Sequence, residues 1–151
     1  MSNKINKILN VVNLFTDRIT WDEYFMALAV LTSARSSCNR LHVGCVLVKD
    51  KRVLATGYNG FLANAPHISR VRNNHEQNTC HSEINAVTDC AKRGVSCKDS
   101  TAYITYYPCI SCLKCLVSAG ITKIIYKSDY KNDELCTKLA KDINLPIIKF
   151  G

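Results

Sequence analysis

The stretch TAYITYYPCISCLKCLVSAGITKIIY, residues 101–126, decides the fold. Its first part, 101–105, and its last part, 123–126, are rich in β-branched and aromatic residues, so both are predicted strands. Between them, residues 110–119 have the apolar spacing of a helix, which Gly120 closes. A strand, a helix and a second strand in direct succession predict a parallel pair joined by a right-handed crossover.

The segments on either side extend this alternation. A capping-box pattern, Thr20 to Glu23, begins a predicted helix that ends near residue 36. The other predicted elements are hairpin strands at 41–48 and 52–56, helices at 4–14, 82–93 and 133–142, and a strand at 146–150. We therefore expect an α/β fold, a three-layer α/β/α sandwich with a mixed five-stranded sheet. Its first two strands form the hairpin and its last three are parallel.

The composition is that of a folded globular protein, since 47% of the 151 residues are hydrophobic and 21% are charged. We expect a single domain over residues 1–151, with residues 1–20 as an N-terminal helical extension.

The longest apolar run, 24–31, is too short to span a bilayer, and no secretory apolar segment follows the start. Nine cysteines make an odd set, which favours reduced thiols or metal ligands. We expect a cytoplasmic protein with no membrane partner.

Two short motifs at predicted helix starts indicate a metal centre. His81-Ser-Glu83 opens one helix, and Pro108-Cys109-Ile-Ser-Cys112 opens the next. Helices that follow neighbouring strands begin at the same edge of a sheet, so these side chains are expected to converge. One imidazole and two thiolates are ligands that zinc prefers, and they leave the fourth tetrahedral position open for water. Glu83 is then the candidate base that moves the water proton.

A structural zinc site completed by Cys115 is the alternative interpretation, because C-x-x-C-x-x-C also resembles iron–sulfur spacing. At ~100° per residue, Cys115 lies about 240° around the helix from Cys109, which argues against a shared ion. We therefore expect Cys115 to be a small core residue, together with Cys45, Cys90, Cys97 and Cys136.

These motifs, taken together, resemble the deoxycytidylate deaminases of the cytidine deaminase-like superfamily. The resemblance begins at WDEYFMALA (21–29) and continues through RSSCNRLHVGCVLVKDKRVLATGYNG (35–60). It then covers HSEINA (81–86), YYPCISCLKCLVSAGITKIIY (106–126) and SDYKND (128–133). His-x-Glu followed by Pro-Cys-x-x-Cys is typical of zinc-dependent base deaminases.

The resemblance implies His81, Cys109 and Cys112 as zinc ligands and Glu83 as the proton shuttle. It also implies that the substrate phosphate and sugar are held by Arg40, Asn59, Tyr130 and Lys131. Asn59 also lies in an Asn-Gly pair, which is a turn signal by itself. A second, structural zinc has candidate ligands in Cys38, His67, His75, Glu76 and Cys80. The family resemblance further implies a homohexamer, activated by dCTP and inhibited by dTTP, with Mg²⁺ accompanying these effectors.

The function implied is zinc-dependent hydrolytic deamination of dCMP to dUMP and ammonia, which supplies dUMP for dTMP synthesis. One alternative is an enzyme that also deaminates dCTP, and another is a deaminase of single-stranded nucleic acid or tRNA. A third is a non-catalytic zinc-binding assembly protein. The formal net charge of +8 favours anionic partners. Because the sequence has no basic tail or phosphate-binding glycine loop, we expect nucleotides rather than nucleic acid.

Overall fold

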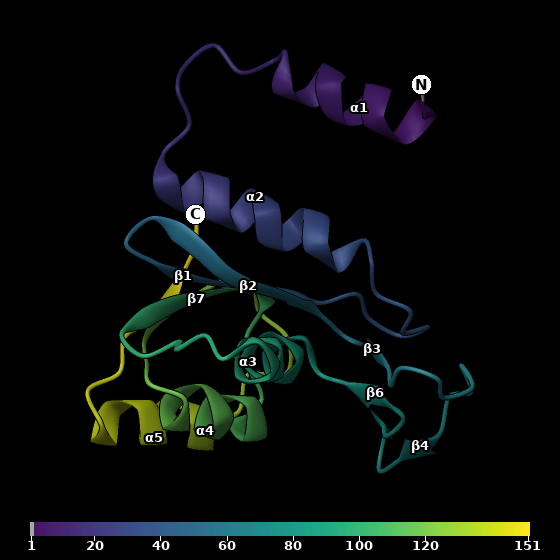
Figure 1. Ribbon diagram of the computed structural model, residues 1–151. Coiled ribbons are helices and arrows are strands. Elements are labelled where there is room, and N and C mark those ends of the chain that lie inside the picture. Colours follow the sequence, from purple (N-terminus) through teal and green to yellow (C-terminus); the bar gives the residue numbers. More distant parts are fainter. Residues whose placement is uncertain (1) are drawn as a thin grey trace.

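The computed structural model describes residues 2–151 and contains a five-stranded mixed sheet with helices on both faces (Figure 1). The helices are α1 (Asn3–Val12), α2 (Trp21–Ser33), α3 (Ser82–Arg93), α4 (Ile110–Ser118) and α5 (Glu134–Asp142). The main strands are β1 (Gly44–Lys49), β2 (Arg52–Tyr58), β7 (Ser100–Tyr106), β8 (Ile121–Ser128) and β9 (Ile147–Lys149).

The strand order is β2-β1-β7-β8-β9. β1 runs antiparallel to both β2 and β7, whereas β7, β8 and β9 are parallel to one another. The predicted mixed sheet, with a hairpin followed by three parallel strands, is therefore confirmed.

The two faces of the sheet carry separate apolar clusters. α2 covers one face, where Phe25, Met26 and Ala29 pack with sheet residues such as Val46 and Tyr103. α3, α4 and α5 cover the opposite face, and Figure 1 shows these three helices together below the sheet. The cluster on that side includes Leu47, Ile104, Leu113, Leu116 and Ile124. Burial on both faces gives the three layers expected from the sequence.

Local signals place the helix and hairpin ends close to their predicted positions. Thr20 Oγ1 accepts a hydrogen bond from the Glu23 N–H, and the Glu23 carboxylate accepts one from the Thr20 N–H, so the capping box is complete. Gly94, with φ of 67°, ends α3 in the left-handed conformation that glycine adopts easily. Asp50 and Lys51 have φ of 50° and 58°, as a tight hairpin turn requires.

The long segment after β2 contains four two-residue strands. These are β3 (Gly60–Phe61), β4 (Val71–Arg72), β5 (His75–Glu76) and β6 (Thr79–Cys80). β3 pairs with β6, and β4 pairs with β5, in both cases antiparallel. The β3–β6 pairing holds the end of this long segment next to its beginning. The chain therefore enters α3 from a fixed point close to the end of β2.

The first helix forms as predicted but none of its residues is buried. Its apolar residues include Ile5, Leu9 and Val12, which are each half exposed, and Figure 1 shows α1 apart from α2. None of the helices within residues 2–151 has the length and apolar character needed to cross a bilayer.

The cysteines follow their predicted placement with one exception. Cys45, Cys90, Cys97 and Cys136 are buried, whereas Cys115 is only half-buried. The expectation that Cys115 is a core residue was therefore wrong, because its position on α4 lies at the margin of the packed face. All nine cysteines are free thiols.

Gly57 permits close contact between β2 and α3, the helix that begins at the metal-centre motif. A methyl group at this position would collide with the Ser82 carbonyl oxygen and lie 2.6 Å from the Ala86 amide nitrogen. Both are backbone atoms of α3, so neither can turn away.

Gly57→Ala should therefore lower the free energy of unfolding by about 2 kcal/mol, the usual cost of overpacking. Urea denaturation followed by circular dichroism measures this change. Gly94→Asn is the matched control, because Gly94 has nothing within 4 Å of its added Cβ and Asn tolerates positive φ. Equal stability of the two variants would contradict the proposed contact.

Candidate metal centre

Two helix starts meet at one edge of the sheet. His81 is the N-cap of α3 and Cys109 is the N-cap of α4. α4 follows the carboxyl end of β7, and the Asn85 side chain near the start of α3 donates to the Tyr58 carbonyl at the end of β2. Because β2 and β7 are both antiparallel to β1, their carboxyl ends lie on the same edge.

The side chains of His81, Cys109 and Cys112 form a compact ligand set. Their ligand atoms all lie within 4.8 Å of one another. The His81 Nδ1 atom is 3.6 Å from the Cys109 sulfur and 3.3 Å from the Cys112 sulfur. Tetrahedral zinc with ordinary Zn–N and Zn–S bond lengths places such atoms about 3.5 Å apart, so the donor set fits zinc.

No fourth protein ligand joins this set among residues 2–151, where the group of His, Cys, Asp and Glu ligand atoms contains only these three. Cys112 is buried, Cys109 is half-buried and His81 is exposed. The alternative in which Cys115 completes a structural site is therefore not supported. The exposed side at His81 is where solvent and substrate can approach.

Hydrogen bonds and the position of Cys109 at the N-terminus of α4 favour the thiolate form of this cysteine. The Cys112 thiol and then His81 donate toward the Cys109 sulfur and lower the pKa of Cys109 to about 4. The same contact with Cys109 raises the pKa of Cys112, and the hydrogen bond to Cys109 raises the pKa of His81. The Cys112 amide also points at the Cys109 sulfur, 3.5 Å away, as expected for an anion at a helix N-terminus.

Glu83 lies in the first turn of α3 and is buried, with 5% of its surface exposed. Burial raises the pKa of its carboxyl group. The Ser82 hydroxyl donates to Glu83 Oε2 at 2.8 Å, which leaves Oε1 as the oxygen without this partner. A carboxyl group with a raised pKa beside a metal centre can both accept and return a proton near neutral pH.

In the sequence, Ser82 stands only as the spacer between His81 and Glu83. Its hydroxyl in fact orients the Glu83 carboxylate. A hydroxyl residue directly before a candidate base was the only signal in the sequence that could have suggested this contact.

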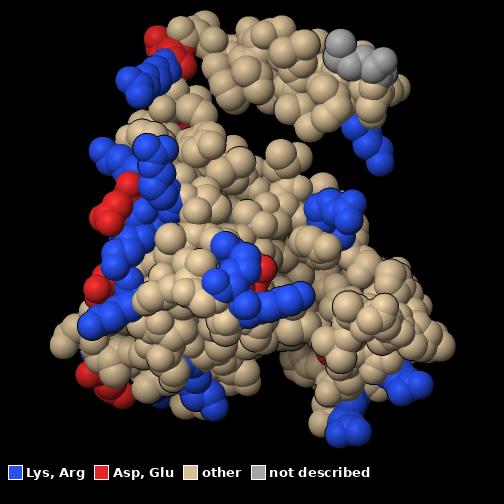
Figure 2. All heavy atoms as spheres, viewed as in Figure 1, with Lys and Arg blue, Asp and Glu red and all other residues tan. Residues whose placement is uncertain are grey.

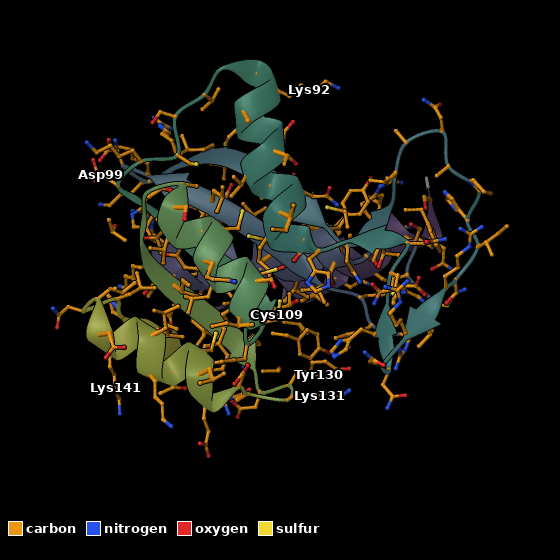
Figure 3. The ribbon with its side chains drawn as sticks, turned by 90° about the horizontal axis from the view of Figure 1, so that it is seen from below. Lys92, Asp99, Cys109, Tyr130, Lys131 and Lys141 are labelled. Carbon is orange, nitrogen blue, oxygen red and sulfur yellow. The ribbon has the colours of Figure 1, made fainter. Side chains whose placement is uncertain are left out.

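Tyr130 and Lys131 lie near the metal centre, on the loop between β8 and α5. Figure 3 shows them beside the start of α4, where Cys109 lies. The Tyr130 ring makes an edge contact with Tyr106, the last residue of β7, at a centroid distance of 5.9 Å. The Lys131 Nζ atom lies 5.5 Å from the Tyr130 ring. Tyr106 was not singled out from the sequence, although it stands just before the Pro-Cys motif.

Arg40 and Asn59 lie in two other connecting segments, Arg40 between α2 and β1 and Asn59 between β2 and β3. The Arg40 guanidinium donates to the Asn74 carbonyl at 2.7 Å. Asn59 is buried; its Oδ1 accepts from the Ser36 hydroxyl and the Val43 N–H, and its Nδ2 donates to the Leu41 carbonyl. Asn59 thus holds the loop that carries Arg40, and the hydrogen bonds of both residues go to other partners than the three ligand side chains.

Cys109→Ser should reduce bound zinc to less than a tenth of the wild-type content, because hydroxyl oxygen replaces a thiolate ligand. Cys115→Ser is the matched control on the same helix and should retain the wild-type content. Metal analysis of the purified proteins by mass spectrometry measures both. Loss of zinc from the Cys115 variant, or its retention in the Cys109 variant, would overturn the assignment.

Comparison with known proteins agrees with this geometry. Residues 19–128 match the family described as the cytidine and deoxycytidylate deaminase zinc-binding region. The chain is 38% identical over 135 residues to ComE operon protein 2 of Bacillus subtilis (strain 168), covering 87% of this chain and 71% of that protein. It is 35% identical over 144 residues to deoxycytidylate deaminase of Saccharomyces cerevisiae, covering 89% of this chain but only 46% of that protein.

Among solved structures, the crystal structure of dCMP deaminase from the cyanophage S-TIM5 in complex with dCMP and dUMP is similar over most of the chain. The TM-score is 0.76 and the identity 28%, over 85% of this chain and 95% of that one. The family match spans the three ligand residues and Glu83. The chain therefore belongs to the cytidine and deoxycytidylate deaminase zinc-binding family.

Proposed function

We propose that this protein catalyses the hydrolytic deamination of dCMP to dUMP and ammonia and so supplies dUMP for dTMP synthesis. The single observation that carries the proposal is the buried Glu83 carboxyl beside the three-ligand set of His81, Cys109 and Cys112. The relatives named deoxycytidylate deaminase and the similar structure with dCMP and dUMP support this substrate.

His81, Cys109 and Cys112 are proposed to hold the zinc ion, which when bound supplies Lewis-acid activation of a water molecule. Glu83 accepts a proton from that water, and its Oε1 is the proposed acceptor because Oε2 already accepts from Ser82. The carboxyl group would then deliver this proton to the ring nitrogen N3 of cytosine, take the second proton from the hydroxyl added to the ring carbon, and pass it to the departing amino group. The water oxygen remains on the ring carbon, and ammonia leaves.

The raised pKa of Glu83 suits this double role, since burial makes its carboxyl group a stronger base than an exposed one. Ser82 fixes the orientation of the carboxylate, so the proton acceptor does not have to be ordered at each turnover.

Tyr130, Lys131 and Arg40 are proposed to bind the phosphate end of dCMP. Tyr130 and Lys131 stand on a loop that contacts Tyr106 at the end of β7, close to the metal centre. Lysine provides a point charge rather than the planar fork of arginine. Asn59 is proposed to contribute by holding the loop that carries Arg40, because its oxygen and one amide hydrogen are already engaged there.

We further propose that the chain forms one deaminase domain over residues 1–151, with residues 1–20 as an extension, and assembles as a homohexamer. Exposed apolar side chains on α2, Val30 and Leu31, support a subunit contact. Activation by dCTP and inhibition by dTTP, with Mg²⁺ bound to these nucleotides, complete the proposal. A monomeric mass in solution, or a dCMP rate indifferent to both nucleotides, would contradict it.

A second, structural zinc ion would draw its ligands from Cys38, His67, His75, Glu76 and Cys80. Several of these groups already have partners: Glu76 accepts from Ser69 and Arg70, and His67 stacks on Phe61. We therefore propose one zinc ion per chain, and a measured content of two would contradict this. A cytoplasmic location is proposed because all nine cysteines, Cys109 and Cys112 among them, are free thiols; recovery from an oxidising compartment would oppose it.

Glu83→Gln should lower kcat for dCMP by about 10³-fold, because general acid–base catalysis contributes roughly 10²–10⁴. Its zinc content should remain that of the wild type. Release of ammonia, followed with dCMP, dCTP, deoxycytidine and oligonucleotides as substrates, measures both the rate and the substrate choice. Glu134→Gln, a change at an exposed acid in the first turn of α5, is the control. Near-normal turnover by the Glu83 variant would rule out its proposed role.

Arg40→Gln should raise KM for dCMP about tenfold while kcat stays near the wild-type value, because the lost interaction acts on the phosphate in both ground and transition states. Deoxycytidine lacks the phosphate, so its kcat/KM should not change. Steady-state kinetics with both substrates provide the comparison. A parallel loss for dCMP and deoxycytidine would instead show that Arg40 acts only by supporting its loop.

A further inference from the structure

A cavity lies at the edge of the sheet opposite the metal centre. It has a volume of about 750 Å³ and lies between the start of α2 and the β1–β2 hairpin. Val48 of β1 pairs with Thr101 near the start of β7, whereas the metal centre follows the end of that strand. At roughly 3.3 Å per residue, the length of β7 separates the two sites by about 20 Å.

Three cations line this cavity: Arg18, Lys51 and Arg52. All three are exposed, and within residues 2–151 none forms an ion pair with an acidic side chain. Asp22 accepts from the Tyr103 hydroxyl and Glu23 accepts from the Thr20 N–H, whereas Asp17 and Asp50 adjoin the cations in sequence without lining the cavity. The residues that line the cavity include three cations and no acid, so the lining itself is positively charged.

Two exposed aromatic rings line the same cavity. Trp21 is 44% exposed and Tyr24 is 41% exposed, and their ring centroids are 6.1 Å apart. Trp21 is supported by stacking on the buried Phe25, and the Lys51 Nζ atom lies 5.6 Å from the Trp21 ring. Exposed rings of this kind offer faces and edges on which nucleic acid bases can stack.

Basic side chains continue beyond the cavity. Figure 2 shows Lys and Arg gathered, with a few acidic residues between them, along the edge that carries the hairpin in Figure 1. Lys49 pairs with Arg52 across the hairpin and is partly exposed, and its ammonium group forms an ion pair with Asp99 at 3.9 Å. A rim of cations longer than the cavity matches a ligand that carries successive phosphates rather than one compact phosphate group.

We propose that this cavity binds a short segment of single-stranded nucleic acid. Its phosphates pair with Arg18, Lys51 and Arg52, and its bases stack on Trp21 and Tyr24. Aromatic platforms combined with a basic rim are the usual means of binding single strands without sequence preference. This binding is independent of deamination, because the cavity and the metal centre are at opposite edges of the sheet. The proposal departs from the expectation, drawn from the sequence, that the chain binds nucleotides rather than nucleic acid. Arg18 and Lys51 are far apart in the sequence, so their common cavity could not be predicted from it.

Trp21 is the only tryptophan of the chain, so its fluorescence reports on this cavity alone. Titration with a twelve-nucleotide deoxyadenosine strand at low salt should produce a saturable change in that fluorescence. With three phosphate contacts, the logarithm of the binding constant should fall with the logarithm of salt concentration with a slope of about −2. The probes dATP and tripolyphosphate should bind at least about tenfold more weakly.

The variant Lys51→Gln with Arg52→Gln should bind the strand at least about tenfold more weakly and reduce the slope to about −0.7. Lys138→Gln with Lys141→Gln, on α5 on the other face of the sheet, removes the same charge and should change binding less than about twofold. Both double variants should deaminate dCMP at the wild-type rate. Three results would each overturn the proposal: strand binding without a change at Trp21, equal weakening by both double variants, or binding of dATP as tight as that of the strand.

Discussion

The proposed chemistry depends on two helix N-termini that meet at one edge of the sheet. His81 caps α3 and Cys109 caps α4, and their ligand atoms approach to 3.6 Å. This approach requires the carboxyl ends of β2 and β7 to lie together, which follows from the antiparallel position of β1 between them. It also requires α3 to lie close to β2, which the missing side chain of Gly57 permits. The order of the strands thus brings together His81 and Cys109, which are 28 residues apart in sequence.

The two edges of the sheet differ in their physical character. The edge with the metal centre combines a buried carboxyl, a buried thiol and N-terminal amides, so its charges act at short range and with little screening by water. The edge with the hairpin is exposed, basic and aromatic, so its attraction is longer in range and sensitive to salt. One fold therefore carries a site for chemistry and, as proposed, a separate surface for a polyanion.

Most element boundaries could be predicted because their signals are local. The capping box at Thr20, the left-handed Gly94 and the apolar spacing of residues 110–119 each act over a few residues, and the structure confirms them. α1 also forms where predicted, but periodicity alone could not reveal that its apolar residues would remain exposed. The placement of Cys115 was wrong for a similar reason, since its burial depends on how far the packed face of α4 extends.

The sequence by itself determined the candidate ligand types, their spacing at helix starts and the alternation of strands and helices, because these depend on neighbours along the chain. Only the tertiary structure decided what distant residues do. Asn59 proved to be engaged by the loop before β1, and Arg40 by the Asn74 carbonyl. Arg18 came to line one cavity with Lys51 although the two residues are 33 positions apart in sequence. Such contacts depend on how the layers pack, which no local pattern specifies.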